Sequence, residues 1–314
     1  MRWRRRAGAV ALGLLVDRAL GEPPTALHPV AHFGQAMERL EARRWEPHRG
    51  AGVRYALSGA AIGVAGGRLG TLVLGPSASL VAATATAAAG RSLLSSARAV
   101  GRALEDGDTE GARRLLPSLV GRDPEGLDEK EMARAVIESV AENLSDAVVA
   151  TAFWGVVAGT EGVLVHRAVN TMDAMVGHRS PRYERFGWAA ARLDDMLAWP
   201  AARLSALLVA AVTPGATKAV WSAIREQAAE HPSPNAGVAE AAFAAALGLR
   251  LGGVNRYEGR EEVRPPLGWG RPPEPADVAR AVALADRAIL LLTALCAAPG
   301  FLSLLRQTSR RGSA

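Results

Sequence analysis

The stretch ESVAENLSDAVVATAFWGVVAGTEGVLVHRAVNTMDAMVGHRSPRYERFGWAAARLDDMLAWPAARL, residues 138–204, decides the fold because it places carboxylates, amides and arginines on both sides of an apolar run. The run extends from Ala147 to Val165 and holds a single acid, Glu161. At about 1.5 Å per residue it approaches the ~30 Å thickness of a bilayer core. The sequence therefore predicts a membrane helix with polar groups at its ends that a merely structural span would not need.

Three acids lead into this run at a spacing of four residues: Glu138, Glu142 and Asp146. On an α-helix, at about 100° per residue, they share one face. Mg²⁺ prefers a few carboxylates together with water and phosphate oxygens, so this face is predicted to bind magnesium at a membrane surface. Asn143 adds an amide beside the acids. The alternative is a solvated helix face near the membrane.

A second polar layer follows the run. Asn170 and Asp173 are three residues apart and share a helix face, and Gly177 is the expected helix stop. The loop after it carries Arg179, Arg182 and Arg185. Guanidinium groups bind phosphate or carboxylate in a bidentate manner, which favours anion recognition, although a positive-inside membrane loop would also explain them.

A denser cluster lies just ahead of the next apolar run and consists of Arg192, Asp194 and Asp195. Adjacent acids are costly to keep charged together, so we expect a metal ion or a guanidinium between them.

Several further apolar runs occur. They are Leu69–Gly90, Ala198–Thr217 and Ala288–Leu305, with Tyr55–Gly67 as a weaker span or hairpin arm and Ala236–Gly253 as a re-entrant or buried helix. The predicted fold is all-α: a polytopic helical membrane protein with about four to five membrane segments. It forms a single integral-membrane domain over residues 1–314. A soluble helical protein is the alternative, but a surface helix should show a polar face.

Polar segments separate these runs. Arg91–Glu142 is predicted to form two or three amphipathic helices, punctuated by glycine and proline, and Gly259–Pro275 is predicted to be a surface loop. The N-terminal segment resembles a signal peptide, but Asp17 and Arg18 follow its apolar core directly, which favours a short tilted span or an interfacial helix. The arginines that open the chain predict a cytoplasmic N-terminus.

Composition restricts the function classes. A net charge of +6 fits anionic lipid or anionic substrates, whereas the scattered arginines and the absence of an aromatic platform argue against nucleic acid. Cys296 is the only cysteine, which excludes an intramolecular disulfide and a cysteine-built zinc site. No G-x-x-x-x-G-K-[ST] or G-x-G-x-x-G motif occurs. A bound phosphate would therefore depend on arginines and carboxylate-bound magnesium.

Two further segments carry candidate binding residues. His28 lies beside proline in EPPTALHPVAHFG, where a structural role in a turn is the alternative to substrate binding. The string SPNAG contains Asn235 and is expected to start a helix whose free N–H groups can hold an anion, with Glu240 in its first turns. A plain helix cap explains the same string.

Together these motifs resemble the adenosylcobinamide-phosphate synthases of cobalamin biosynthesis, which are polytopic membrane proteins. The strings that carry the resemblance are DRALGEPPTALHPVAHFG, LVGRD, ESVAENLSD, HRAVNTMDAMVGHRSPRYERFGWAAARLDD and SPNAGVAEAAFAAALGLRLGG. Small departures occur: Ala147 stands where the family usually has glycine, Ala174 where serine is frequent and His178 where tyrosine is frequent.

The resemblance implies an amide ligase in the cell membrane. It would join a propionate carboxylate of adenosylcobyric acid to (R)-1-amino-2-propanol or its O-phosphate, with ATP as the driving force, Mg²⁺ as the metal and an active site that faces the cytoplasm. Membrane lipid is an expected partner, as are a second copy of the chain or other membrane enzymes of the corrinoid pathway.

Under this hypothesis the metal ligands are Glu138, Glu142 and Asp146. The catalytic residues are Glu138, Glu142, Asp173, Asp194 and Asp195, which act in metal binding or as a base. The substrate-binding residues are His28, Asn143, Asn170, Arg179, Arg192, Asn235 and Glu240, and Arg179 and Arg192 bind the phosphates.

Two other classes stay open. A magnesium-dependent membrane prenyl or phospho-alcohol transferase should carry a D-x-x-x-D repeat, which Asp194 and Asp195 do not provide. A non-enzymatic scaffold or transporter of the corrinoid pathway should carry its polar residues in mid-membrane. For the ligase, the path of Ala147–Val165 is decisive, because a single crossing would separate the two polar layers and a hairpin near Gly159 would not.

Overall fold

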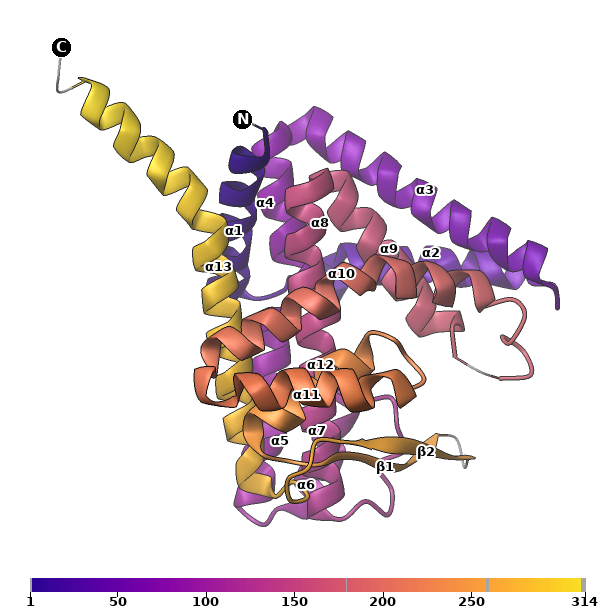
Figure 1. The fold of residues 1–314 in the computed structure, drawn as a ribbon. Coiled ribbons are helices and arrows are strands. Elements are labelled where there is room, and N and C mark those ends of the chain that lie inside the picture. The colour runs from indigo at the N-terminus through magenta and orange to yellow at the C-terminus, as the bar shows by residue number, and fades with distance from the viewer. Residues whose placement is uncertain (1, 179, 258–259, 312–314) are drawn as a thin grey trace. The chain divides into compact units, whose positions relative to one another are not determined.

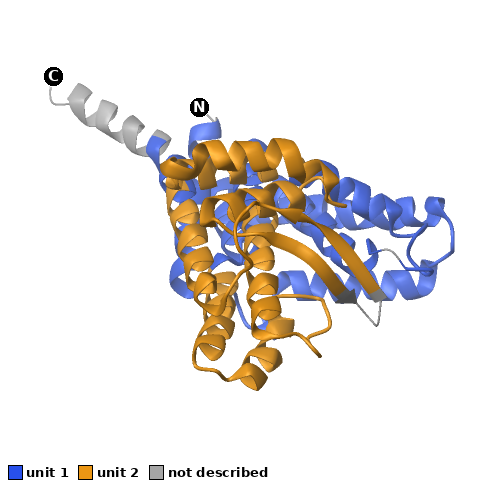
Figure 2. Cartoon of the chain, turned by 60° about the horizontal axis from the view of Figure 1, so that its bottom comes forward, with its two compact units in different colours: residues 1–90, 147–198, 292–314 blue, residues 91–146, 199–291 orange. Residues whose placement is uncertain are grey.

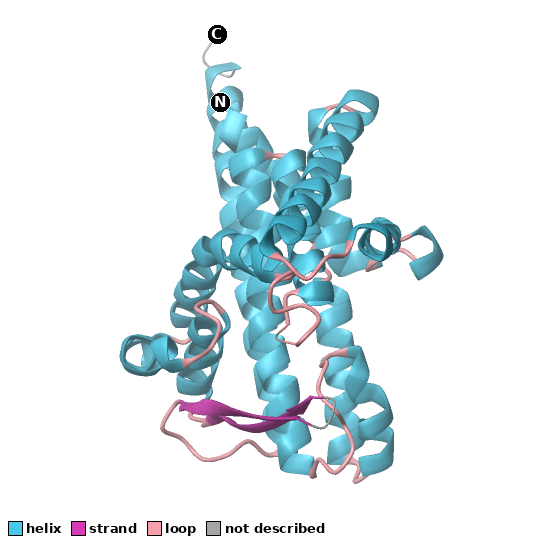
Figure 3. Ribbon diagram, turned by 90° about the vertical axis from the view of Figure 1, so that its right-hand side faces the viewer, coloured by secondary structure: helices cyan, strands magenta, loops and turns pink. Residues whose placement is uncertain are grey.

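Helices make up most of the computed structural model, which describes residues 2–178, 180–257 and 260–311 (Figure 1). The strands β1 (Leu251–Tyr257) and β2 (Arg260–Leu267) pair as an antiparallel hairpin, the one sheet in this part of the chain (Figure 3). The predicted helical membrane fold is thus confirmed, with one correction. The expected surface loop over Gly259–Pro275 is wrong, because much of it forms β2.

The chain divides into two compact units (Figure 2). Unit 1 comprises residues 1–90, 147–198 and 292–314, and unit 2 comprises residues 91–146 and 199–291. Each unit is assembled from separate stretches of sequence. Two long helices, α10 (Trp188–Val212) and α13 (Pro275–Arg311), run from one unit into the other.

Unit 1 is a helical bundle. Its elements are α1 (Arg2–Leu20), the short η1 (Thr25–Leu27), α2 (Pro29–Arg44), α3 (Arg49–Leu74), α4 (Pro76–Ala87), α8 (Ala150–Ala158) and α9 (Thr160–Val176), together with the first part of α10 and the last part of α13. The helix α3 packs along α9, and α4 packs against α1 and α9. Small residues allow this close approach: a Cβ at Gly63 would meet the Leu164 carbonyl oxygen at 2.9 Å.

Two of the apolar runs are broken by glycine. The run Leu69–Gly90 is interrupted at Gly75, whose φ is +78°, so α3 ends at Leu74 and α4 begins at Pro76. The run Ala147–Val165 is interrupted at Gly159, whose φ is +77°. Its two halves, α8 and α9, pack against each other. The single span expected over Leu69–Gly90 is therefore wrong, and of the two paths left open for Ala147–Val165 the hairpin at Gly159 is the one that occurs.

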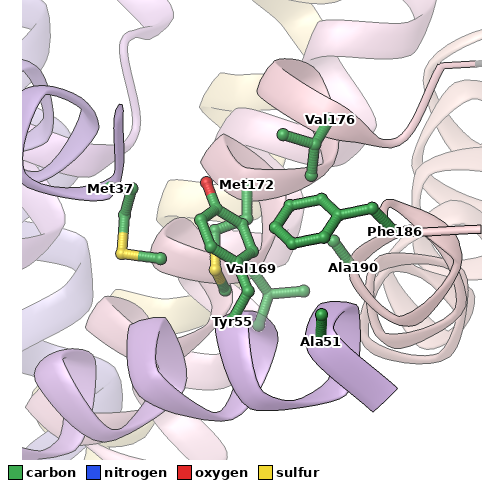
Figure 4. Close-up of a cluster of buried hydrophobic side chains, with 8 residues drawn as sticks. All are labelled: Met37, Ala51, Tyr55, Val169, Met172, Val176, Phe186 and Ala190. Atoms are coloured by element: carbon green, nitrogen blue, oxygen red, sulfur yellow. The ribbon is translucent and has the colours of Figure 1, made fainter. Parts of the chain in front are cut away.

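The core of unit 1 is an apolar cluster that joins α2, α3, α9 and the start of α10 (Figure 4). Its buried members are Met37, Ala51, Tyr55, Val169, Met172, Val176, Phe186 and Ala190. The rings of Tyr55 and Phe186 lie 5.1 Å apart in a tilted arrangement. Through Phe186, this cluster holds the end of the loop that leads into α10.

Unit 2 contains mainly amphipathic helices and the hairpin. Its elements are α5 (Gly90–Glu105), α6 (Thr109–Leu115), η2 (Leu116–Ser118), α7 (Glu129–Asn143), η4 (Pro214–Ala216), α11 (Thr217–Gln227), η5 (Ala228–Glu230), α12 (Ala236–Leu247), β1 and β2, with the remaining parts of α10 and α13. The expected helices over Arg91–Glu142 are confirmed. A π-helical turn, η3 (Leu144–Val149), continues α7.

Among the residues that the structure describes, three helices are long and apolar enough to cross a membrane: α3, α10 and the Pro275–Ala298 part of α13. The helix α3 exposes Leu57, Leu69 and Leu72, as a lipid-facing helix would. The run Ala236–Gly253 forms α12 and then β1, and α12 is too short to span a bilayer at about 1.5 Å per residue. The buried-helix interpretation of this run is the correct one.

Candidate functional site

A cavity of about 220 Å³ opens within unit 2 and is lined mainly by polar groups. Its charged and titratable lining consists of Arg122, Glu138, Glu142, His231, Glu240 and Arg264. These side chains come from the loop before α7, from α7 itself, from the segment that leads into α12, from α12 and from β2. Positively and negatively charged side chains therefore line the same small cavity.

The helix α7 delivers the acids of the cavity. Asp128 caps its first turn: it accepts a hydrogen bond from the Glu131 N–H at 2.8 Å, and Glu131 accepts one from the Asp128 N–H at 3.0 Å. This reciprocal capping box satisfies two backbone donors that a helix start otherwise leaves without partners. Because the helix then runs without interruption to Asn143, Glu138 and Glu142 face the same side, as their spacing predicts.

Glu138 is fully engaged in ionic and hydrogen-bond contacts. One carboxylate oxygen lies 2.5 Å from the Arg122 guanidinium. The other accepts a hydrogen bond from the Gly252 N–H at 2.9 Å and lies 3.5 Å from Arg134. Its side chain is 7% exposed and that of Arg122 is 6% exposed. Glu138 is therefore an internal counterion of arginine, and its oxygens have little capacity left for a metal ion.

The same arginines attach the hairpin to α7. Arg134 donates hydrogen bonds of 2.8 Å to the carbonyl oxygens of Gly252 and Val254, and Arg122 donates one of 2.8 Å to Asn255. Gly252 and Gly253 have φ values of +84° and +116°, and the strand pairing is irregular between residues 251 and 253. This bulge, which glycine permits, leaves the Gly252 backbone free to bond α7.

Glu142 and Glu240 differ from Glu138 because neither carboxylate takes part in a hydrogen bond within the part of the chain that the structure describes. Glu240 is only 7% exposed, and its closest ionic contact is His231, at 3.7 Å. Glu142 is exposed through the open cavity, although protein surrounds it closely. Burial is the main cause that raises the pKa of both carboxyl groups, and Glu138 raises each further.

His231 and Arg264 also line the cavity. Arg264 donates a hydrogen bond of 2.9 Å to His231 Nε2. Because a guanidinium only donates, this contact favours the neutral ring with its proton on Nδ1. Nδ1 lies 3.1 Å from the Ser233 carbonyl oxygen, to which that proton can be donated, and also 3.1 Å from the Ser233 backbone nitrogen. Burial lowers the pKa of His231, and Arg264 lowers it further, which also favours the neutral imidazole.

Two predicted amide residues lie at this site. Asn143 lines the cavity and donates to the Ser139 carbonyl oxygen at 3.0 Å. Asn235 is buried at the start of α12 and accepts a hydrogen bond of 2.8 Å from Arg203. The helix start predicted from SPNAG is confirmed, but Ser233 Oγ accepts the N–H groups of Asn235 and Ala236 at 3.3 and 3.2 Å. Those N–H groups are therefore not available to an anion.

The predicted magnesium ligands do not form a protein-built metal site. Within the described residues, no three His, Cys, Asp or Glu side chains are grouped so that they could hold a metal ion. Asp146 lies in η3, outside the cavity lining, and makes polar contacts of its own. Since Glu138 is held by two arginines, only Glu142 of the predicted trio faces the cavity with its carboxylate unengaged.

The second polar layer lies in unit 1, where its members contact one another. Arg167 donates to Asn170 at 3.2 Å, and Asn170 donates to the buried Asp194 at 3.4 Å. Arg192 lies 3.7 Å from Asp195, in agreement with the guanidinium expected beside the adjacent acids. Asp173, on α9, is also engaged in polar contacts.

The remaining predicted residues of unit 1 have local roles or lie outside the description. His28 caps α2 by accepting the Val30 N–H at 3.2 Å, and its other ring nitrogen lies 3.2 Å from Glu22. Arg182 donates to Glu41 at 2.9 Å and stacks over Trp45 at 4.7 Å, so it anchors its loop to α2. Arg179 lies outside the described residues.

Among the lining residues that carry a charge, an imidazole or an amide, sequence reasoning missed four: Arg122, His231, Asn255 and Arg264. Arg122 belongs to the string LVGRD and His231 directly precedes the SPNAG segment, so both lie in or beside motifs that were recognised. Asn255 and Arg264 lie in the hairpin, which the sequence did not reveal.

Comparison with known proteins places the chain in a family. The family model described as CobD/Cbib protein matches residues 10–285. The chain belongs to this family. A relative from Mycobacterium tuberculosis (strain ATCC 25618 / H37Rv), called cobalamin biosynthesis protein CobD, is 48% identical over 288 residues, which cover 90% of this chain and 92% of the relative.

Proteins of the same name from other bacteria agree. The relative from Chromobacterium violaceum is 43% identical over 301 residues, covering 93% of this chain and 96% of the relative. A relative from Rhodobacter capsulatus is 40% identical over 306 residues, covering 90% of this chain and 93% of the relative. No solved structure matches the chain at a significant level. The family expected from the sequence motifs is confirmed.

Proposed function

We propose that the protein acts in cobalamin biosynthesis as an amide-forming ligase in the cell membrane. It joins a propionate carboxylate of adenosylcobyric acid to 1-amino-2-propanol or its O-phosphate. The observation that carries this proposal is the cavity of unit 2, where carboxylates, guanidinium groups and a neutral imidazole meet in a chain of the CobD/Cbib family. The shared name of the relatives supports the pathway.

The chemistry needs an activated carboxylate. One carboxylate oxygen of the corrinoid attacks the terminal phosphorus of ATP, which gives an acyl phosphate and releases ADP. The amine nitrogen, after losing a proton, attacks the acyl carbon, and inorganic phosphate leaves with the carboxylate oxygen. The products are the amide, ADP, phosphate and the proton lost by the amine.

The residues of the cavity suit the demands of these steps. Negative charge on phosphate and on the tetrahedral intermediate is stabilised by fixed donors, and Arg264 and Arg122 supply guanidinium groups for this. Proton transfer from the amine needs a base that is not already protonated, and Nε2 of the neutral His231 ring can serve once Arg264 turns from it to a phosphate oxygen.

The size of the cavity determines what enters it. Pockets that enclose drug-sized ligands hold about 300–1,000 Å³, and this cavity of about 220 Å³ is smaller. It accommodates the amino alcohol and the end of a propionate side chain, while the corrin macrocycle stays outside. A small cavity thus fits a reaction at the end of a flexible side chain of a large substrate.

Magnesium fits the proposal as an ion that arrives on the phosphates of ATP. The trio predicted to hold it is not assembled at the cavity, and no step above is assigned to a protein-bound metal. The site faces the cytoplasm in this proposal, because ATP and the corrinoid are supplied there.

The test is a direct assay of the product. Detergent-solubilised, full-length protein is incubated with adenosylcobyric acid, Mg-ATP and either the amino alcohol or its phosphate, and the amide is measured by mass spectrometry. We expect product with at least one of the two amines and none without ATP. No amide with either amine would favour the non-enzymatic scaffold instead.

A further inference from the structure

The charges that line the cavity of unit 2 are unevenly paired. The lining carries three carboxylates, Glu138, Glu142 and Glu240, and two guanidinium groups, Arg122 and Arg264. Arg122 pairs with Glu138, as does Arg134 from outside the lining, and Arg264 bonds His231. The guanidinium groups are therefore engaged elsewhere than at Glu142 and Glu240, and a ligand that brings a positive charge would give these two acids a partner.

The structure indicates which carboxylates are available to such a ligand. Glu138 is held by Arg122 at 2.5 Å, by the Gly252 N–H at 2.9 Å and by Arg134 at 3.5 Å. Glu142 and Glu240 accept no hydrogen bond within the described residues. The closest ionic contact of Glu240 is His231, 3.7 Å away, and Arg264 favours the neutral form of that ring.

Two unengaged carboxylates of this kind suit an ammonium group. An ammonium has three N–H donors and one positive charge, so it can donate to two carboxylates and still bond a third group. Charge-assisted hydrogen bonds of this type are short and about twice as strong as neutral ones. Burial mainly raises the pKa of Glu142 and Glu240, and Glu138 raises each further; an ammonium group between the two acids would act in the opposite direction and favour their charged forms.

We propose that Glu142 and Glu240 together bind the ammonium group of the amine substrate and hold its nitrogen inside the cavity. The proposal rests on the ligase function proposed above, and it gives the two acids a role different from the predicted metal binding. Arg264 and His231 line the same cavity and offer hydrogen-bond partners for the rest of the amino alcohol. The pair would therefore select a primary amine over an alcohol of the same size.

Binding of matched ligands to the purified, full-length protein tests this without any turnover. Isothermal titration compares 1-amino-2-propanol O-phosphate with isopropyl phosphate, which has the same skeleton but no amine, and compares 1-amino-2-propanol with 2-propanol. Hydrogen bonds to charged groups predict that the wild type prefers the amine-bearing member of at least one pair by about tenfold or more. Equal binding within both pairs would overturn the proposal.

The variants Glu142→Gln and Glu240→Gln keep the size of each side chain and remove its charge. Each is expected to reduce the amine preference at least about threefold, and the double variant should abolish it. The matched control is Glu226→Gln on α11, an exposed acid of the same unit that pairs with Arg225 at 3.2 Å. If single variants keep the full preference, the proposal is wrong.

A metal site is the rival explanation, and Mn²⁺ binding followed by electron paramagnetic resonance addresses it. If Mn²⁺ binds tightly without nucleotide and Glu142→Gln abolishes that binding, the ligand of the two acids is a metal ion and not the amine, and the proposal is overturned. Thermal unfolding verifies that each variant is folded. If a glutamine variant does not fold, Glu142→Asp or Glu240→Asp is used instead. The shorter side chain keeps the negative charge but places it farther from the ammonium group, so the preference for the amine-bearing ligand should still fall.

The two proposals fail in different ways. An amine preference that depends on both acids, combined with no amide in the product assay, would support this inference and contradict the ligase function. Amide formation with no such preference would support the ligase function and contradict this inference.

Discussion

The ion pair of Glu138 with Arg122 offers a sharp test of how unit 2 is built, because sequence spacing had assigned Glu138 to a metal. In the structure its carboxylate instead joins α7 to the loop before it and to the hairpin, through Arg122 and the Gly252 N–H. Glu138→Gln keeps the shape of the side chain and removes its charge, so Arg122 stays buried without its counterion.

The expected magnitude follows from this burial. Breaking a buried ion pair by removing one partner costs about 3–5 kcal/mol, because the other charge is left uncompensated. The side chains of Glu138 and Arg122 are 7% and 6% exposed, so solvent offers little screening. For chains of roughly this size, 1 kcal/mol corresponds to a shift of about 2–4 °C in Tm. We therefore expect Glu138→Gln to unfold at least about 6 °C below the wild type.

Tryptophan fluorescence during thermal unfolding in detergent measures this shift, since the chain has seven tryptophans. The matched control is Glu125→Gln, an exposed acid in the loop before α7, which should change Tm by about 1 °C or less. If Glu138→Gln unfolds with the control and has lost only activity, the structural role is refuted and the predicted metal or catalytic role is restored.

Three further predictions address other features. Burial raises the pKa of Glu240 in the folded state, so between its unfolded and folded pKa values the folded protein binds more protons than the unfolded chain. Stability therefore falls as pH rises through that window. Glu240→Gln should unfold at a higher temperature than the wild type at pH 8. Arg264→Gln removes the donor to His231 and a guanidinium of the cavity, so amide formation should fall about 100-fold or more while Tm changes little, as rate and unfolding assays will show. Gly159→Ala places a side chain at a φ of +77°, which should cost about 1–3 kcal/mol in thermal unfolding, whereas Gly215→Ala meets nothing within 4 Å and should cost less.

Where helical periodicity continues without interruption, the sequence predicted the structure well. The acids of α7 share a face because a capping box starts the helix and no glycine or proline interrupts it before Asn143. The ends of the helices within the apolar runs were predicted less well, because hydropathy does not reveal where a single glycine adopts the left-handed conformation. Gly75 and Gly159 each end a helix inside an apolar run. Gly75 was included in a predicted span, whereas a hairpin near Gly159 was one of the two paths left open.

The candidate site was predicted in part for a related reason. Glu142, Glu240 and Asn143 lie in recognisable helical motifs, and all three line the cavity. Arg264 lies in a segment rich in proline and glycine that was expected to be a loop, and only the strand pairing brings it to His231. Spacing along α7 also could not show that arginines from elsewhere in the chain converge on Glu138.

The most direct test of the account compares amide formation by the wild type with that by the Glu142→Gln, Glu240→Gln double variant. Both proteins receive adenosylcobyric acid, Mg-ATP and the amine at concentrations that are saturating for the wild type, and product is quantified by mass spectrometry. The account predicts amide from the wild type and a loss of about 100-fold or more in the folded double variant. Equal rates from the two proteins would contradict the claim that the chemistry takes place in the cavity of unit 2.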